Sequence, residues 1–181
     1  MNSMPIRTVA MKETKNKYSL LEKNLPHSLM LELPSEKIEI NFKSISKKHT
    51  LSKLEMEDNL QNSFCLLIGF KGDWKGFAFI SAQYPQINNL PWKEDLLIET
   101  GNIIMGKLLT NLCEKEIILC DLMAPIVFKS LEGTALTDFH RKKKLLNILE
   151  SFTGLETPKV TYTFNWQETL VPFYIHFLYQ S

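Results

Sequence analysis

The sequence lacks the residue patterns that mark several common classes of protein. Its cysteines, Cys65, Cys113 and Cys120, are odd in number and have no C-x-x-C spacing, which favours buried thiols in a reducing compartment over a disulfide framework. No metal-ligand spacing occurs among its histidines, which are His27, His49, His140 and His176. We therefore expect each histidine to be structural or exposed, and no metal or other cofactor to be bound by this chain.

Long apolar runs and a strong net charge are also missing. No run approaches the roughly 20 residues of a membrane span, and the polar segment 1–17 has no apolar stretch typical of a signal peptide. The formal net charge is +1, and the basic run His140–Lys144 is interpreted as the solvated start of a helix rather than as a docking patch for an acidic partner. The sequence thus predicts a cytoplasmic protein without nucleic-acid or membrane partners.

What is present predicts one globular domain over residues 1–181, with 1–17 as a possible flexible tail. The content of 44% hydrophobic and 23% charged residues is ordinary for such a domain. Apolar alternation and turn residues predict an α+β fold, in which two main helices pack on a mostly antiparallel sheet of about six strands. The expected strand segments are Ser28–Leu33, Ile38–Ile45, Ser63–Phe70, Phe77–Ala82, Glu116–Leu122, Val160–Trp166 and Leu170–Tyr179.

The remaining segments receive weaker predictions. Residues 18–25 are expected to form a short helix ended by Pro26, and 46–62 a loop with at most one helical turn. A second main helix is expected from Thr137 or Asp138 to Phe152, with Gly154 near its C-terminal cap. Pro172 suggests that the last strand lies at an edge or contains a bulge.

The central helix, which begins near Asp95, has two contrasting faces. Its apolar positions fall within one broad arc at about 100° per residue and are Leu97, Ile98, Gly101, Ile104, Met105, Leu108 and Leu112. A narrow polar stripe lies on nearly the opposite side and consists of Asp95, Glu99, Asn102 and Gly106. We expect Gly101 to allow close packing against the sheet. Since a mid-helix glycine costs about 1 kcal/mol relative to alanine, Gly106 suggests room for a partner.

The Glu99 and Asn102 pair indicates a particular kind of chemistry. An amide does not titrate near neutral pH, so Asn102 is no general base, but it can hold a water by donating and accepting hydrogen bonds at once. That capacity suits the hydrolysis of an acyl phosphate, where the catalyst mainly positions the nucleophile. Glu99 then serves as an ion-pairing or docking group. The alternative is that both residues are simply solvated on an amphipathic helix.

The spacing Asp95-x3-Glu99-x2-Asn102-x22-Pro125 resembles the signature of the CheC/CheX/FliY family of chemotaxis phosphatases. The hairpin F-C-L-L-I-G-F-K-G-D-W-K-G-F-A-F-I and the helix core E-T-G-N-I-I-M-G also resemble that family, from about Ser63 to Val127. With one E-x-x-N pair, the chain is most similar to single-site CheX-type members, which are commonly homodimers. The first sixty residues, however, look unlike a long amphipathic first helix.

The resemblance implies a phosphatase acting on a phosphorylated CheY-like receiver domain in chemotaxis or two-component signalling. Asn102 would orient the water that attacks the phospho-aspartate, and Glu99 would pair with a receiver lysine. Asp95, Gly106 and Pro125 would have supporting roles. The receiver, and not this chain, would hold Mg²⁺. The alternative is a non-catalytic scaffold of the same fold that docks a receiver or a flagellar or chemotaxis protein. A third possibility is an unrelated α+β adaptor.

Overall fold

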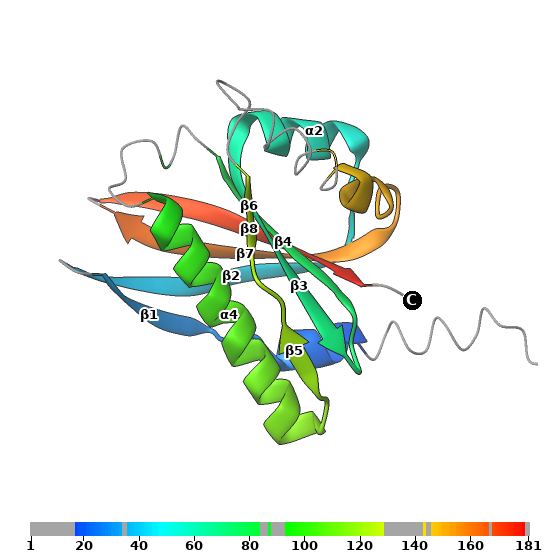
Figure 1. Cartoon of the computed structure of the whole chain (residues 1–181). Helices are drawn as coiled ribbons and strands as arrows, with labels where there is room; N and C mark the ends of the chain where they lie inside the picture. The colour runs from blue at the N-terminus through cyan, green and yellow to red at the C-terminus, as the bar shows by residue number, and fades with distance from the viewer. Residues whose placement is uncertain are drawn as a thin grey trace, which may run out of the picture.

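A single antiparallel sheet forms the body of the protein. The computed structural model describes residues 17–33, 36–83, 87, 93–128, 143, 146–166 and 168–179. The strand order is β1-β2-β7-β8-β4-β3-β5, and β6 also pairs with β3 (Figure 1). The strands are β1 (Ser28–Leu33), β2 (Glu36–Thr50), β3 (Ser63–Gly72), β4 (Gly76–Gln83), β5 (Cys120–Leu122), β6 (Ile126–Phe128), β7 (Glu156–Trp166) and β8 (Thr169–Tyr179).

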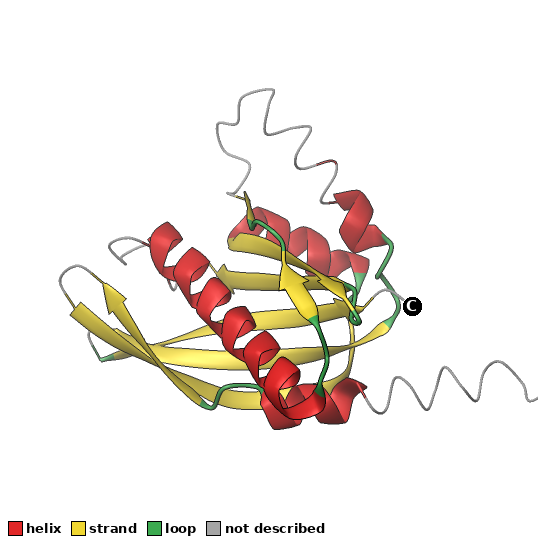
Figure 2. Cartoon of the chain, turned by 60° about the horizontal axis from the view of Figure 1, so that its bottom comes forward, coloured by secondary structure: helices red, strands yellow, loops and turns green. Residues whose placement is uncertain are grey.

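Helices cover both faces of this sheet. The labelled helices are α2 (Lys53–Asn62) and α4 (Lys93–Glu116), and residues 17–24 and 146–150 are also helical. Figure 2 shows α4 lying across one face, with residues 17–24 near its C-terminal end. The predicted α+β class with an antiparallel sheet is confirmed, but the described residues form eight strands rather than about six. No helix among the described residues is long and apolar enough to cross a membrane.

Strand β3 contributes to two separate cores because both of its faces are buried. Leu66 and Ile68 belong to the core that includes α4, whereas Cys65 and Leu67 belong to a second core with residues of α2 and Leu149. The run F-C-L-L-I-G-F therefore shows no apolar–polar alternation. Its predicted hairpin with β4 is confirmed by a continuous antiparallel register.

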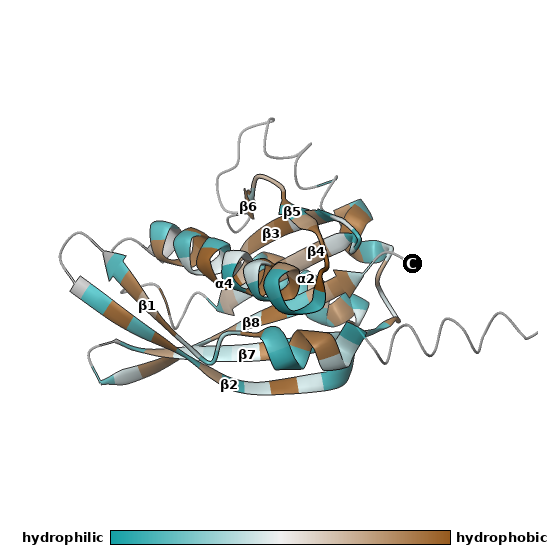
Figure 3. Cartoon of the chain, turned by 90° about the horizontal axis from the view of Figure 1, so that it is seen from below, coloured by the Kyte–Doolittle hydropathy of each residue, from teal (hydrophilic) through white to brown (hydrophobic). Residues whose placement is uncertain are grey.

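Strand β2 is longer than predicted and is irregular. Apolar and polar residues alternate in the first half of β2 (Figure 3), where Ile38 and Ile40 are buried. A register shift between Phe42 and Ser44 then inserts one residue opposite β7, and this restores Ile45 to the buried face. The strand continues to Thr50, through a segment predicted to be loop.

Helix α2 corrects the prediction of a loop over 46–62. The Ser52 hydroxyl accepts a hydrogen bond from the Glu55 backbone N–H at 3.1 Å, which caps the helix. Met56 and Leu60 then pack into the second core. The Ser-x-x-Glu spacing is a known helix-start signature that could have indicated this helix.

The end of helix α4 and the position of β8 in the sheet also differ from the predictions. Helix α4 continues to Glu116, so the expected strand 116–122 is reduced to β5, and Ile117 leaves the helix with a φ of 56°.

Strand β8 is interior, between β7 and β4, although Pro172 lies in the part that pairs only with β7. Gly154 has a φ of 81°, in agreement with its expected cap region. Of the expected tail 1–17, Lys17 is helical and residues 1–16 lie outside the described residues, as does the expected helix start at 137–138.

Candidate functional site

Helix α4 is seated on the sheet by its apolar face. Leu97, Ile104 and Leu112 are almost completely buried in the first core. A Cβ added to Gly101 would lie 2.7 Å from Leu66 Cδ2 and 2.8 Å from Ile80 Cδ1. The expectation that Gly101 allows close packing is therefore confirmed.

The polar stripe lies on the solvent side of the same helix. Asp95 and Glu99 are exposed, and Asn102 and Gly106 are half-buried. A Cβ added to Gly106 would meet no atom within 4 Å, so the surface one turn beyond Asn102 is open. Within the described part of the chain, no hydrogen bond or ion pair engages Glu99 or Asn102. Both polar groups are thus free to meet a partner.

The C-terminal half of α4 is tied to the helical segment 17–24. The Asn111 side-chain amide donates a hydrogen bond to the Asn24 carbonyl oxygen at 2.9 Å. Lys23 forms an ion pair with Glu116 at 2.7 Å, and the Lys23 hydrogen bond holds the pKa of this carboxyl below its usual range. These contacts, together with the buried face, fix the helix that presents the stripe.

Pro125 is placed apart from the helix, on the connection between β5 and β6. That connection runs beside β3, where the Met123 backbone N–H donates to the Gly69 carbonyl oxygen at 2.8 Å. A Cβ at Gly69 would come within 2.7 Å of the Met123 sulfur, so the glycine permits this close crossing. The structure therefore brings four of the five predicted site residues onto one helix face, and Pro125 lies in the segment that follows.

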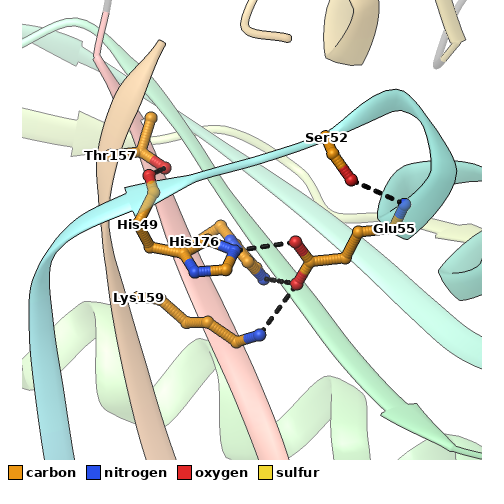
Figure 4. Close-up of polar contacts among 6 residues, drawn as sticks. All are labelled: His49, Ser52, Glu55, Thr157, Lys159 and His176. Carbon is orange, nitrogen blue, oxygen red and sulfur yellow. Dashed lines mark hydrogen bonds and ion pairs between the residues drawn. The ribbon is translucent and has the colours of Figure 1, made fainter. Parts of the chain in front are cut away.

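A second polar group, which the sequence did not indicate, lies at the start of α2 (Figure 4). We call it the histidine cluster, and it consists of His49, Glu55, Lys159 and His176. Glu55 Oε2 lies 2.8 Å from His49 Nε2, and Glu55 Oε1 lies 2.8 Å from Lys159 Nζ and 3.9 Å from His176 Nε2. Its members come from β2, α2, β7 and β8, so no sequence spacing could have joined them.

The electrostatics of the histidine cluster are dominated by burial and by Lys159. Although burial favours the protonated carboxyl, hydrogen bonds from Lys159 and His49 hold the pKa of Glu55 below its usual range. Burial, reinforced by the positive charge of Lys159, lowers the pKa of His176 to about 3. His176 is therefore a neutral imidazole at neutral pH.

An extra residue in β2 aims His49 into this cluster. Ser46 pairs with Lys159, but the next pair is His49 with Thr157, so β2 advances three residues while β7 advances two. In a regular ladder Lys48 would take that place, and His49 would point to the other face. The Thr157 hydroxyl also donates a hydrogen bond to the His49 carbonyl oxygen at 3.2 Å, which holds the strand here.

Comparison with known proteins gives structural neighbours but no sequence match. No protein-family model and no curated protein matches the chain. FliY from Thermotoga maritima is 11% identical, with 98% of this chain and 92% of that chain covered and a TM-score of 0.49. The FliM middle domain from H. pylori is also 11% identical, with coverages of 95% and 88% and a TM-score of 0.48.

Another neighbour is described as the CheX-CheY-BeF3-Mg+2 complex from Borrelia burgdorferi. It is 12% identical, with 94% of this chain and 97% of that chain covered and a TM-score of 0.43. The family named from the sequence pattern is thus represented among the structural neighbours, by both CheX and FliY proteins. At such identities the likeness concerns the fold alone, and the chemistry must come from this chain's own residues.

Proposed function

We propose that this protein is a phosphatase for a phosphorylated, CheY-like receiver domain in chemotaxis or two-component signalling. The observation that carries the proposal is the exposed Glu99 and the half-buried Asn102 side by side on a firmly packed helix, with an open surface at Gly106. The spacing from Asp95 to Pro125 supports the same assignment, because it matches the family signature.

The chemistry follows from what each side chain can do. The Asn102 amide enters the receiver's active site, where it donates to and accepts from one water and so orients it for attack on phosphorus. The bond between phosphorus and the aspartyl oxygen breaks, and inorganic phosphate leaves. The receiver supplies the Mg²⁺ that neutralises the phosphoryl charge.

Glu99 acts in docking rather than in proton transfer. It lies one turn before Asn102 on the same face, and its exposed carboxylate pairs with a lysine of the receiver. The open position at Gly106 lets the receiver approach the helix closely. Asp95 is exposed at the N-terminal end of the stripe, where the helix dipole interacts favourably with a carboxylate.

The decisive experiment measures the decay of a phosphorylated receiver from the same organism, with and without this protein. We expect faster decay with the native chain and loss of the acceleration with Asn102→Ala. Glu99→Gln should weaken receiver binding, whereas Glu114→Gln, an exposed change on another side of α4, should alter neither property.

Binding and hydrolysis must be followed separately in this experiment. A receiver that binds the native chain while its decay stays unchanged would identify a non-catalytic docking module. Unchanged decay without binding would contradict both forms of the proposal. Circular dichroism of each variant confirms that the fold is retained.

A further inference from the structure

The polar group least explained by the fold is His176 in the histidine cluster. Its side chain is 1% exposed, and neither ring nitrogen has a hydrogen-bond partner among the described residues. An unsatisfied buried polar group costs about 1–3 kcal/mol. Burial of an imidazole beside a carboxylate, without a hydrogen bond to it, therefore calls for a ligand between them.

We propose that His49, Glu55 and His176 bind a divalent transition-metal ion of the zinc type. One ligand atom from each residue lies within 4.8 Å of those from the other two. Bonds of about 2.0–2.1 Å to a central ion would draw nitrogen and oxygen ligands to just over 3 Å from one another. To hold the ion, the widest ligand pair would close from at most 4.8 Å, while His49 Nε2 and Glu55 Oε2, which lie 2.8 Å apart, would open slightly.

The chemistry of the ligand set selects the class of metal. Two imidazoles and one carboxylate suit zinc and its first-row neighbours, whereas Mg²⁺ and Ca²⁺ prefer oxygen ligands throughout. A metal ligand must offer a free lone pair, and neither ring nitrogen of His176 has a hydrogen-bond partner among the described residues. This proposal departs from the expectation, based on histidine spacing, that the chain binds no metal.

The site is open on one side and closed on the other. His49 and Glu55 have side chains 25% and 26% exposed, so an ion can enter past them and reach the buried His176. The bound ion would join helix α2 to strands β2 and β8. These two strands do not pair with each other, because β7 lies between them. Since His176 and Leu178 share a face of β8 and Leu178 belongs to the second core, the site lies on the side of the sheet away from α4.

The position of Lys159 leads to a specific prediction about zinc affinity. Its ammonium lies 2.8 Å from Glu55 Oε1 and repels an incoming cation. Its replacement by methionine removes the charge, which also lies 4.8 Å from the centre of the Tyr174 ring, and keeps an unbranched side chain at this position. Lys159→Met should therefore bind zinc more tightly, by at least about tenfold, whereas a purely structural role for the cluster gives no such gain.

The test is a titration of the full chain, stripped of metal with EDTA, against Zn²⁺ in competition with a chromophoric chelator. The exposed thiol is first removed by Cys113→Ser, so that it cannot bind the ion. We expect one Zn²⁺ per chain and no competition from Mg²⁺. Co²⁺ should give the visible absorption of an ion with nitrogen and oxygen ligands.

Matched histidine variants locate the site. His49→Gln should weaken zinc binding by at least about 100-fold, and His27→Gln, an exposed histidine outside the cluster, should leave it unchanged. If His176→Gln does not fold, the partly exposed His49 still decides the question. Absence of zinc binding at micromolar concentration, or binding that survives His49→Gln, would overturn the proposal.

Discussion

Replacement of Gly106 by alanine tests the two-faced character of α4 most directly. Glycine in a helix interior is about 1 kcal/mol less favourable than alanine, and a Cβ at Gly106 meets no atom within 4 Å. Nothing offsets the gain in helix propensity. Gly106→Ala should therefore raise the free energy of unfolding by about 1 kcal/mol, or the melting temperature by about 2–4 °C for a chain of this size.

Gly101→Ala is the matched control, because it makes the same chemical change on the buried face. The new methyl group would lie 2.7 Å from Leu66 Cδ2, 2.8 Å from Ile80 Cδ1 and 3.1 Å from Ile68 Cδ1. Overpacking a core typically costs about 1–3 kcal/mol, which exceeds the gain of about 1 kcal/mol in propensity. The net change should be destabilising by about 1 kcal/mol.

Urea and thermal unfolding of the two variants, followed by circular dichroism, give the comparison. A loss of stability in Gly106→Ala, or equal changes in both variants, would refute the assignment of the two glycines to opposite faces. The same variants probe function, since the proposed receiver approaches at Gly106. Gly106→Leu should slow receiver dephosphorylation while the fold remains intact, because the larger side chain blocks the surface beside Asn102.

Three further predictions concern the rest of the chain. Ser52→Ala should lower the free energy of unfolding by about 1 kcal/mol, since it removes the cap of α2, and urea unfolding measures this. A thiol reagent should modify the exposed Cys113 in the native protein. It should reach Cys65 only in denaturant, because burial shields that thiol and raises its pKa. As pH falls from about 6.5 towards 3, the unfolded chain binds a proton that the buried His176 does not. This proton alone should cost metal-free protein up to about 1.4 kcal/mol of stability per pH unit, and His176→Gln should make the pH dependence of unfolding shallower by that share.

The helix and its stripe could be predicted because the information is local. A period of about 3.6 residues sorts α4 into two faces, and that pattern decides which face is buried. The β3–β4 hairpin was predictable for the same reason, since an apolar run, a turn and a second apolar run follow one another in sequence. The activity assigned to the stripe stays a prediction, because an exposed Glu99 and a half-buried Asn102 permit docking but do not require it.

The course of β2 could not be predicted because its length depends on a distant strand. The segment Ser46–Thr50 has no apolar alternation, and it is extended because β7, more than a hundred residues later, pairs with it. Helix α2 is different, because the Ser52 and Glu55 spacing carried a local signal for its start. The helix was nevertheless hard to predict because its amphipathic pattern is weak. Met56 and Leu60 supply most of its apolar burial.

The histidine cluster shows why a site built from several strands cannot be predicted from the spacing of its residues in the sequence. His49 reaches the cluster only because β2 contains one extra residue before it, and His176 only because β8 pairs with β7 in a particular register. A shift of one residue in either strand would turn one imidazole to the other face of the sheet. The bulge therefore decides which side chain lies opposite Thr157 and faces the cluster. Exchange of the two neighbours, Lys48→His together with His49→Lys, keeps the composition of the chain but moves the imidazole off that position, and it should abolish zinc binding.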